Sequence, residues 1–158
     1  MIRVGILLGL LVLFAAAQEA APDAVQIWTA AALAQGEQAL KAEAATDAHH
    51  TAVHHLADFP NDTFMLSHRE ADGIVEWHEN QVDVFFVQSG TATLLAGGNM
   101  VGGQTTEPHE KRNGAIEGGI RYHLSAGDVV RIPARTPHQI LLDGSKGFTY
   151  FVVKVKGY

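Results

Sequence analysis

Short hydrophobic runs alternate with glycine-containing turns from about residue 53 to the end of the chain. Turn segments such as Ala71-Asp72-Gly73 and Asp143-Gly144-Ser145 consist of residues that tolerate tight turns and positive φ angles. Runs this short and this closely spaced predict an all-β barrel or sandwich. The predicted strands cover residues 53–57, 64–68, 74–78, 82–87, 91–96, 119–124, 129–132, 138–142 and 148–155.

The first 48 residues have a different character. Arg3 is followed by an apolar segment, 4–14, and by small residues at 15–17, which predicts a signal peptide over 1–17. The apolar segment is shorter than the about 20 residues that span a bilayer. We therefore expect no stable membrane span after cleavage and a periplasmic or secreted protein, with an uncleaved anchor as the alternative.

A helical extension is predicted over 18–48, before a barrel domain over 49–158. The stretch 30–45 is dense in Ala, Leu, Gln, Glu and Lys, which favours a helix, and Thr29 is in position to be its N-cap. Leu33 and Leu40 give this helix one apolar stripe for packing on the barrel.

Composition excludes several classes of partner and ligand. The net charge is -6 and the 11 Lys and Arg residues are scattered, which argues against nucleic acid because a phosphate backbone is bound by clustered cations. The chain has no cysteine, so a metal site must use His and carboxylate ligands. The segment 102–118, rich in Gly, Thr and charge, is predicted as a long irregular loop that covers or lines a binding site.

Two distant segments carry ligand-type side chains. Glu76 and His78 are two positions apart in a predicted strand, so they project from the same face. Asp83 follows a short turn and is expected to fold back toward His78 across the hairpin. His138 opens an otherwise apolar strand much later in the chain.

The first of these segments resembles the first motif of the cupin superfamily, the small jelly-roll barrels in which inward-facing side chains hold a metal ion. The match is Glu76-x-His78, four residues, Asp83, six residues and Gly90. Glu76 stands where the family usually has its first histidine, and Asp83 is one methylene shorter than the usual glutamate.

The second segment resembles the second cupin motif. Gly127, Pro133 and His138 match in register, whereas Arg135 replaces a glycine and Leu142 replaces an asparagine. The resemblance covers about residues 60–156. It implies an all-β fold, a cupin-type jelly-roll β-barrel with a short N-terminal helix after the signal peptide.

The resemblance implies one divalent metal ion among Glu76, His78, Asp83 and His138. Two imidazoles and two carboxylates suit Mn, Fe, Zn, Ni or Co. We expect His78, His138 and one carboxylate to form the core of the site, with the other carboxylate bound loosely or acting as a general base. Glu76 is the candidate for that catalytic role. The alternative is a barrel without metal, in which Glu76 and His78 form an internal hydrogen-bonded pair.

A mainly apolar pocket for a small organic ligand is expected below the metal. Its predicted lining consists of Phe85, Val87, Ile140 and Leu142, with His68 and Tyr150 as strand residues that reach the same cavity. A register shift of one residue would turn each of the last two outward.

Two functions fit these features. The first is a metal-dependent enzyme of the oxygenase, isomerase or lyase type acting on a small organic substrate. The second is a non-catalytic barrel that binds a small molecule in the periplasm. The reaction stays open because one fold supports many activities. The resemblance also suggests a homodimer.

Overall fold

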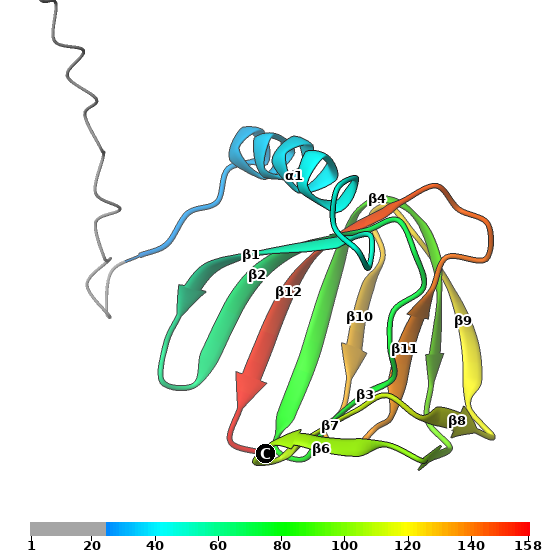
Figure 1. Cartoon of the computed structure of the whole chain (residues 1–158). Coiled ribbons are helices and arrows are strands. Elements are labelled where there is room, and N and C mark those ends of the chain that lie inside the picture. The colour runs from blue at the N-terminus through cyan, green and yellow to red at the C-terminus, as the bar shows by residue number, and fades with distance from the viewer. Residues whose placement is uncertain (1–24) are drawn as a thin grey trace, which may run out of the picture.

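The computed structural model describes residues 25–158, and the predicted signal peptide, 1–17, lies outside the described residues. The described chain forms one helix, α1 (Ala30–Ala44), and twelve β-strands, ten of which build two curved antiparallel sheets facing each other (Figure 1). The predicted all-β fold with an N-terminal helix is therefore confirmed.

The strands are arranged as follows. The first sheet has the order β1 (Thr51–Asp58), β2 (Asp62–Arg69), β12 (Phe148–Lys156), the first half of β4 (Gln81–Ala96) and β10 (Val129–Ile132). The second has the order β9 (Ile120–Ser125), the second half of β4, β11 (His138–Leu141), β3 (Glu76–His78), β7 (Glu110–Arg112) and β6 (Gln104–Glu107). A separate pair consists of β5 (Asn99–Val101) and β8 (Ala115–Glu117).

Strand β4 joins the two sheets. It runs along the first sheet, bends near Gly90 and returns along the second (Figure 1). Gly90 has a φ of 79°, and a Cβ there would collide with the carbonyl oxygen of Gly147, so the bend requires glycine. Separate strands over 82–87 and 91–96 were predicted; they are one strand because pairing continues on both sides of the bend.

The predicted irregular loop over 102–118 is wrong. It contains β6, β7 and β8, and β6 and β7 pair as a hairpin. These strands are three or four residues long and mostly exposed. They therefore lack the alternation of apolar and polar residues by which half-buried strands are identified.

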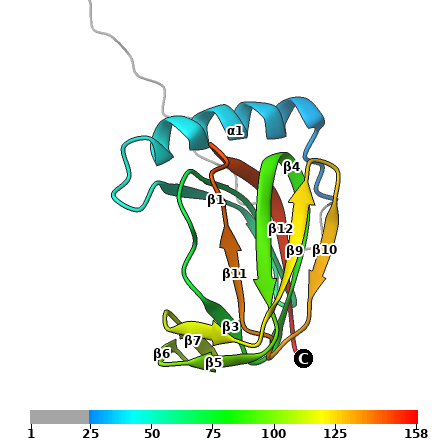
Figure 2. The same cartoon turned by 90° about the vertical axis from the view of Figure 1, so that its right-hand side faces the viewer.

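The main hydrophobic core fills the space between the two sheets. Helix α1 packs outside it, against β1 and β2 (Figure 2). Leu40 and Ala44 of the helix form a small buried cluster there with Ala52 of β1 and Leu66 of β2. The side chain of Thr29 accepts a hydrogen bond of 3.1 Å from the backbone N–H of Ala32, as expected for the N-cap. Within residues 25–158, no helix is long and apolar enough to cross a membrane. The main core consists of Phe85, Val87, Ala92, Leu94, Ala96, Leu124, Ile132, Ile140, Leu142, Phe148, Tyr150 and Val152.

The two ends of the sandwich differ in chemistry. At the end covered by α1, the buried carboxylate of Glu37 accepts hydrogen bonds from Gln88 (2.9 Å) and Ser89 (2.6 Å) beside the bend of β4. At the opposite end, β3 and β7 cross the opening, and β4 and β11 begin there (Figure 1). The ligand-type side chains gather at this second end.

Candidate metal centre

One nitrogen or oxygen atom from each of Glu76, His78 and His138 lies within 4.8 Å of the others. Nε2 of His78 is 3.6 Å from Oε2 of Glu76 and 3.3 Å from Oδ2 of Asp83, and the same Asp83 oxygen is 3.5 Å from Nε2 of His138. Both imidazoles are only 3% exposed. The four predicted ligands therefore lie together in a buried cluster.

Strand geometry explains this convergence. Glu76 and His78 alternate with Trp77 in β3, so both face the interior while the indole faces outward. Glu76 and His138 are direct cross-strand partners between β3 and β11. Side chains of such partners lie on the same face of the sheet, about 5 Å apart at Cβ.

Hydrogen bonds orient both imidazoles. Nδ1 of His78 lies 2.6 Å from Oε2 of Glu110, and Nδ1 of His138 lies 3.0 Å from the carbonyl oxygen of Thr136. A carboxylate and a carbonyl only accept hydrogen bonds here, so each Nδ1 carries the proton. In the neutral imidazole each Nε2 then presents a lone pair to the shared space between Glu76 and Asp83, which is the arrangement that metal-binding histidines adopt.

The contribution of β7 to the site was not predicted from the sequence. Its register places Glu110 opposite His78 and Arg112 opposite Glu76. Glu110 is 8% exposed and bonds His78, while Nη1 of Arg112 pairs with Oε2 of Glu76 at 2.7 Å. The spacing of Glu110 and Arg112 by two residues was the available signal, because alternate residues of a strand share a face.

Lys154 is the second group that the sequence analysis missed. It is the cross-strand partner of Asp83 in β12, and its Nζ donates hydrogen bonds of 2.9 Å to both Asp83 oxygens and to Nε2 of His78. The ammonium group therefore uses lone pairs that a metal ion would also need. Both Asp83 oxygens are bound to Lys154, whereas Glu76, His78 and His138 each offer one donor atom within 4.8 Å of the others. Lys154 also contacts Nε2 of His78, and Arg112 pairs with Glu76, so a metal ion has to displace or share these contacts.

Both carboxylates of the cluster are ionised at neutral pH. Burial alone raises the pKa of Asp83, but hydrogen bonds with His138 and His78 and the charge of Lys154 hold it well below its usual value. Burial also raises the pKa of Glu76, and the charges of His138, Lys154 and Arg112 outweigh that effect and lower it. These carboxylates are therefore in the charge state that metal coordination needs.

The donor set fits a divalent transition metal. Ligand atoms bound to one such ion at about 2.0 to 2.2 Å lie roughly 3 to 3.5 Å apart. Nε2 of His78 and Oε2 of Glu76 are 3.6 Å apart, and all three donor atoms lie within 4.8 Å of one another, so binding an ion draws them slightly together. Two imidazoles with a carboxylate suit Mn, Fe, Co, Ni or Zn. The hydrogen bonds on both Nδ1 atoms supply the outer support that such ligands require.

A cavity of about 470 Å³ lies next to the cluster, between the two sheets. Of the predicted pocket residues, Phe85 and Tyr150 line it. Val87, Ile140 and Leu142 are packed in the main core. The other lining groups are mostly polar or charged, and include Arg69, Glu76, Asp83, Arg112 and Lys154.

His68 lies outside this cavity. In β2 the alternate residues Thr63, Met65, Ser67 and Arg69 line the cavity, so His68 faces the other side, the side of Leu66 and α1. The ring is 1% exposed, and its Nδ1 is 2.8 Å from the hydroxyl oxygen of Thr149. The structure thus assigns His68 to packing between the sheet and the helix.

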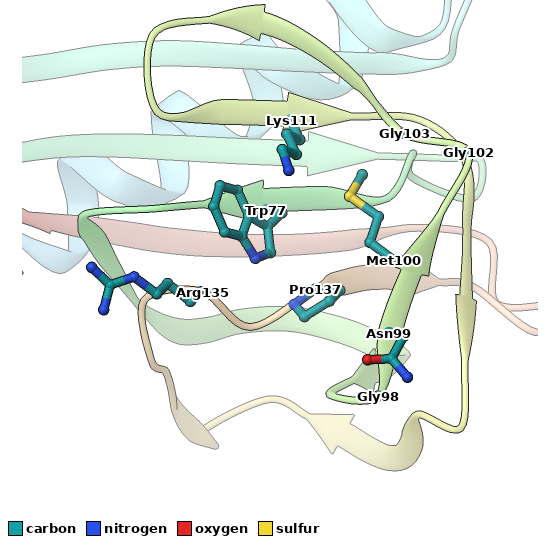
Figure 3. A pocket seen from close by; sticks show the side chains of 9 residues that line it. All are labelled: Trp77, Gly98, Asn99, Met100, Gly102, Gly103, Lys111, Arg135 and Pro137. Carbon is teal, nitrogen blue, oxygen red and sulfur yellow. The ribbon is translucent and has the colours of Figure 1, made fainter.

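A second cavity, of about 330 Å³, lies on the outer side of β3 (Figure 3). Trp77 and Met100 point into it, and Nζ of Lys111 lies 4.8 Å from the centroid of the Trp77 ring (Figure 3). Arg135, at the position where the cupin motif has glycine, has a φ of 61°, and its backbone N–H donates a 2.7 Å hydrogen bond to the carbonyl of His78. This left-handed residue therefore helps hold the ligand strand in place.

Comparison with known proteins identifies the fold. No protein-family model matches the chain, and no curated protein matches its sequence. Among solved structures, a conserved protein with a double-stranded β-helix domain from Klebsiella pneumoniae matches with a TM-score of 0.51 and 18% identity, over 68% of this chain and 77% of that one. The cupin domain of Cnp3 from Schizosaccharomyces pombe matches with a TM-score of 0.51 and 9% identity, over 67% and 64%. A predicted oxalate decarboxylase from Thermotoga maritima matches with a TM-score of 0.50 and 13% identity, over 67% and 80%. At these identities the likeness shows a shared fold.

Proposed function

We propose that this chain, which has the fold of the cupin superfamily, binds one divalent metal ion through Glu76, His78 and His138. We further propose that it is a metal-dependent enzyme for a small organic substrate, of the oxygenase, isomerase or lyase type. The observation that carries the proposal is the orientation of the two imidazoles. Glu110 and Thr136 accept the Nδ1 protons, so both Nε2 lone pairs are directed at one space beside Glu76.

The residues around this space have distinct roles in the proposed chemistry. A bound divalent ion supplies a Lewis acid that polarises an oxygen atom of the substrate. Glu76 is ionised and lines the cavity, so it serves as a ligand or as a proton acceptor. Lys154 also lines the cavity; its N–H groups are directed at Asp83 and His78, so it contributes a fixed positive charge beside the ligands. The 470 Å³ cavity is of the size that holds small organic molecules.

Elemental analysis of the protein purified without a histidine tag tests metal binding. We expect about one equivalent of a transition metal in the wild-type protein and almost none in the His78→Ala/His138→Ala variant. His123→Ala is the matched control, because His123 is exposed on β9 and lies outside the cluster. Equally low metal content in the wild type and the double variant, after growth with each candidate metal, would refute the proposal.

The class of reaction follows from two further measurements. Oxygen consumption by the metal-loaded protein with a substrate separates oxygenase chemistry from isomerase or lyase chemistry, which needs only a Lewis acid and a base. Tight retention of a small molecule without turnover, across a broad panel, would favour the non-catalytic binding barrel instead.

We also propose that the protein is exported to the periplasm or secreted. The proposal rests on the pattern of residues 1–17, which lie outside the described residues. Mass spectrometry of the mature protein from fractionated cells should show loss of this segment and a periplasmic or extracellular product. A full-length chain in the cytosolic fraction would contradict it.

A further inference from the structure

Four cationic side chains line the 470 Å³ cavity, and three of them are paired with carboxylates. Arg112 pairs with Glu76 at 2.7 Å, Lys154 with Asp83 at 2.9 Å and Lys156 with Asp58 at 2.7 Å. The fourth cation is Arg69 on β2. Within residues 25–158, no carboxylate forms an ion pair with its guanidinium group.

Arg69 is held in place although it has no ion pair. One of its terminal nitrogens donates a 3.1 Å hydrogen bond to the hydroxyl of Tyr150, and its Cζ lies 5.9 Å from the centroid of the same ring. Its Nε is buried and has no hydrogen-bond partner among the described residues. A Cβ on Gly73 would lie 2.6 Å from Nη1 of Arg69, so the glycine leaves room for the guanidinium group.

The position of Arg69 connects it to the metal centre. Another cavity, of about 610 Å³, adjoins the 470 Å³ cavity, and Arg69, Glu76 and Arg112 line both. A small molecule in this space therefore contacts Arg69 at one end and reaches Glu76, a proposed metal ligand, at the other. Burial lowers the pKa of Arg69, but Tyr150 and the charges of Glu76 and Asp72 outweigh burial and raise it, so the guanidinium group stays charged while no carboxylate in the described part of the chain contacts it.

We infer that the ligand of this cavity carries a carboxylate group, which Arg69 and Tyr150 bind. The guanidinium group presents N–H donors in the planar arrangement that matches a carboxylate. The Tyr150 oxygen accepts its hydrogen bond from Arg69, so its own proton is available for the same anion. Glu76, Asp83 and Glu107 also line the cavity and repel a phosphate dianion more strongly than a ligand with one negative charge, which favours a carboxylate. The substrate class is thus a small carboxylic acid; its approach to the metal rests on the proposed function, whereas its binding to Arg69 does not.

Calorimetric titration of the purified protein tests this inference. The probes are 2-hydroxy and 2-oxo acids of three to six carbons, each compared with its own amide, and inorganic phosphate as a separate probe. We expect at least one acid to bind about tenfold or more tightly than its amide, a difference of about 1.4 kcal/mol. This preference should be lost in Arg69→Met and reduced in Arg69→Lys, which keeps the charge but not the planar donors.

Arg121→Met is the control variant, because Arg121 is exposed on β9 and pairs with Asp143 outside the cavity. It should keep the preference for acids, and thermal melts should show that each variant is folded. The inference fails if no acid binds, if acids and amides bind alike, or if the preference survives in Arg69→Met. It also fails if phosphate binds more tightly than every acid in a manner that depends on Arg69.

The same titrations with metal-loaded and chelator-treated protein separate the two proposals. A preference for acids that depends on Arg69, in a protein that binds no metal, leaves this inference standing and refutes the proposed metal centre. A protein that binds metal but does not distinguish acids from amides refutes this inference alone.

Discussion

The side chain of Lys154 controls how many ligands of the cluster are available to a metal ion, because it binds both Asp83 and His78. Asp83 is 2% exposed, and Lys154 neutralises it across the β4–β12 pair. The same ammonium group contacts His78 Nε2, so Lys154 and a metal ion compete for two of the four candidate ligands. Removal of one partner from a buried ion pair leaves an uncompensated charge, which is far more costly than breaking an exposed pair.

We predict that Lys154→Met raises the affinity for a divalent ion, because the variant frees Asp83 and His78 and removes a positive charge. The free energy of unfolding of the metal-free variant should fall by about 3 to 5 kcal/mol, since Asp83 loses its partner, and added metal should restore much of it. Chelator competition and urea unfolding measure both effects. Lys156→Met, which breaks the more exposed pair with Asp58, is the control and should change the metal affinity and the free energy of unfolding only slightly. Weaker metal binding by Lys154→Met would contradict the prediction.

Titration of His138 makes metal binding depend on pH. Burial lowers the pKa of His138, but hydrogen bonding with Asp83 and the charges of Asp83 and Glu76 outweigh burial and raise it above 6.5. A raised pKa stabilises the metal-free fold below pH 6.5, and this contribution is lost as the pH rises through the pKa of the folded state. A metal ion must displace the proton, so its affinity should rise about tenfold per pH unit until His138 is neutral.

This prediction is checked by measuring the metal dissociation constant, and the melting temperature of the metal-free protein, from about one pH unit below to about two pH units above the ordinary histidine pKa of 6.5. In the variant His138→Gln, both the metal dissociation constant and the melting temperature should depend less on pH. The pKa of Asp83 is lowered instead, so its stabilising contribution is present above pH 3.8 and is lost only as the pH falls through its lower folded-state pKa. Acid unfolding should therefore occur well below the pH at which metal is released.

At the scale of single elements, β7 supports the site and α1 supports the fold. The β6–β7 hairpin was expected as a loop near the binding site, and its second strand carries Glu110 and Arg112 to the two ligands of β3. At the other end of the sandwich, α1 places Glu37 under the bend of β4. Each element contributes one carboxylate that accepts hydrogen bonds from a neighbouring strand: Glu110 of β7 from His78 in β3, and Glu37 of α1 from Gln88 and Ser89 in β4.

We predict that Glu110→Gln weakens metal binding about 10- to 100-fold, the usual effect of losing the outer partner of a metal-bound histidine. The amide still accepts a hydrogen bond from His78, so the melting temperature should change little. Glu107→Gln is the matched control, because Glu107 is exposed on the same hairpin. Equal affinities for the two variants, determined by chelator competition, would show that Glu110 does not support the site.

We predict that Glu37→Ala lowers the free energy of unfolding by about 1 to 3 kcal/mol, since Gln88 and Ser89 lose a charged acceptor in a buried position. Burial of Glu37 raises its pKa, but the hydrogen bonds from Lys41, Ser89 and Gln88 outweigh this and lower it. The stabilising contribution is therefore present above pH 4.5 and lost on acidification. Urea unfolding measures the change, with the exposed Glu43→Ala as the control; equal losses in the two variants would contradict it.

At the scale of the whole molecule, the two edges β9 and β10 flank a cleft of about 720 Å³ lined by Ile120, Tyr122 and Val129. These side chains are 48 to 60% exposed, and exposed apolar patches beside sheet edges favour association. The homodimer stays a prediction. Light scattering should give twice the monomer mass for the wild type and a monomer for the variant Tyr122→Asp/Val129→Asp, and a monomeric wild type would refute it.

The sequence alone determined the strand composition, the helix and the shared face of Glu76 and His78. Each of these is a local property. Successive side chains of a strand point to opposite faces of the sheet, and an N-cap side chain accepts a hydrogen bond from a backbone N–H in the first turn of the helix. The spacing from His78 through Asp83 to Gly90, together with Gly127, Pro133 and His138, also indicated the cupin fold that the comparisons show.

The groups that surround those ligands depend on contacts between distant strands. Lys154 meets Asp83 from 71 residues away, and the pairing of β7 with β3 assigns Glu110 to His78. The same pairing rule places Arg69 inside the cavity and His68 outside it, although they are neighbours in β2. Register between strands depends on the packing of both sheets and the bend at Gly90, and a shift of one residue exchanges the two faces. No local pattern contains that information.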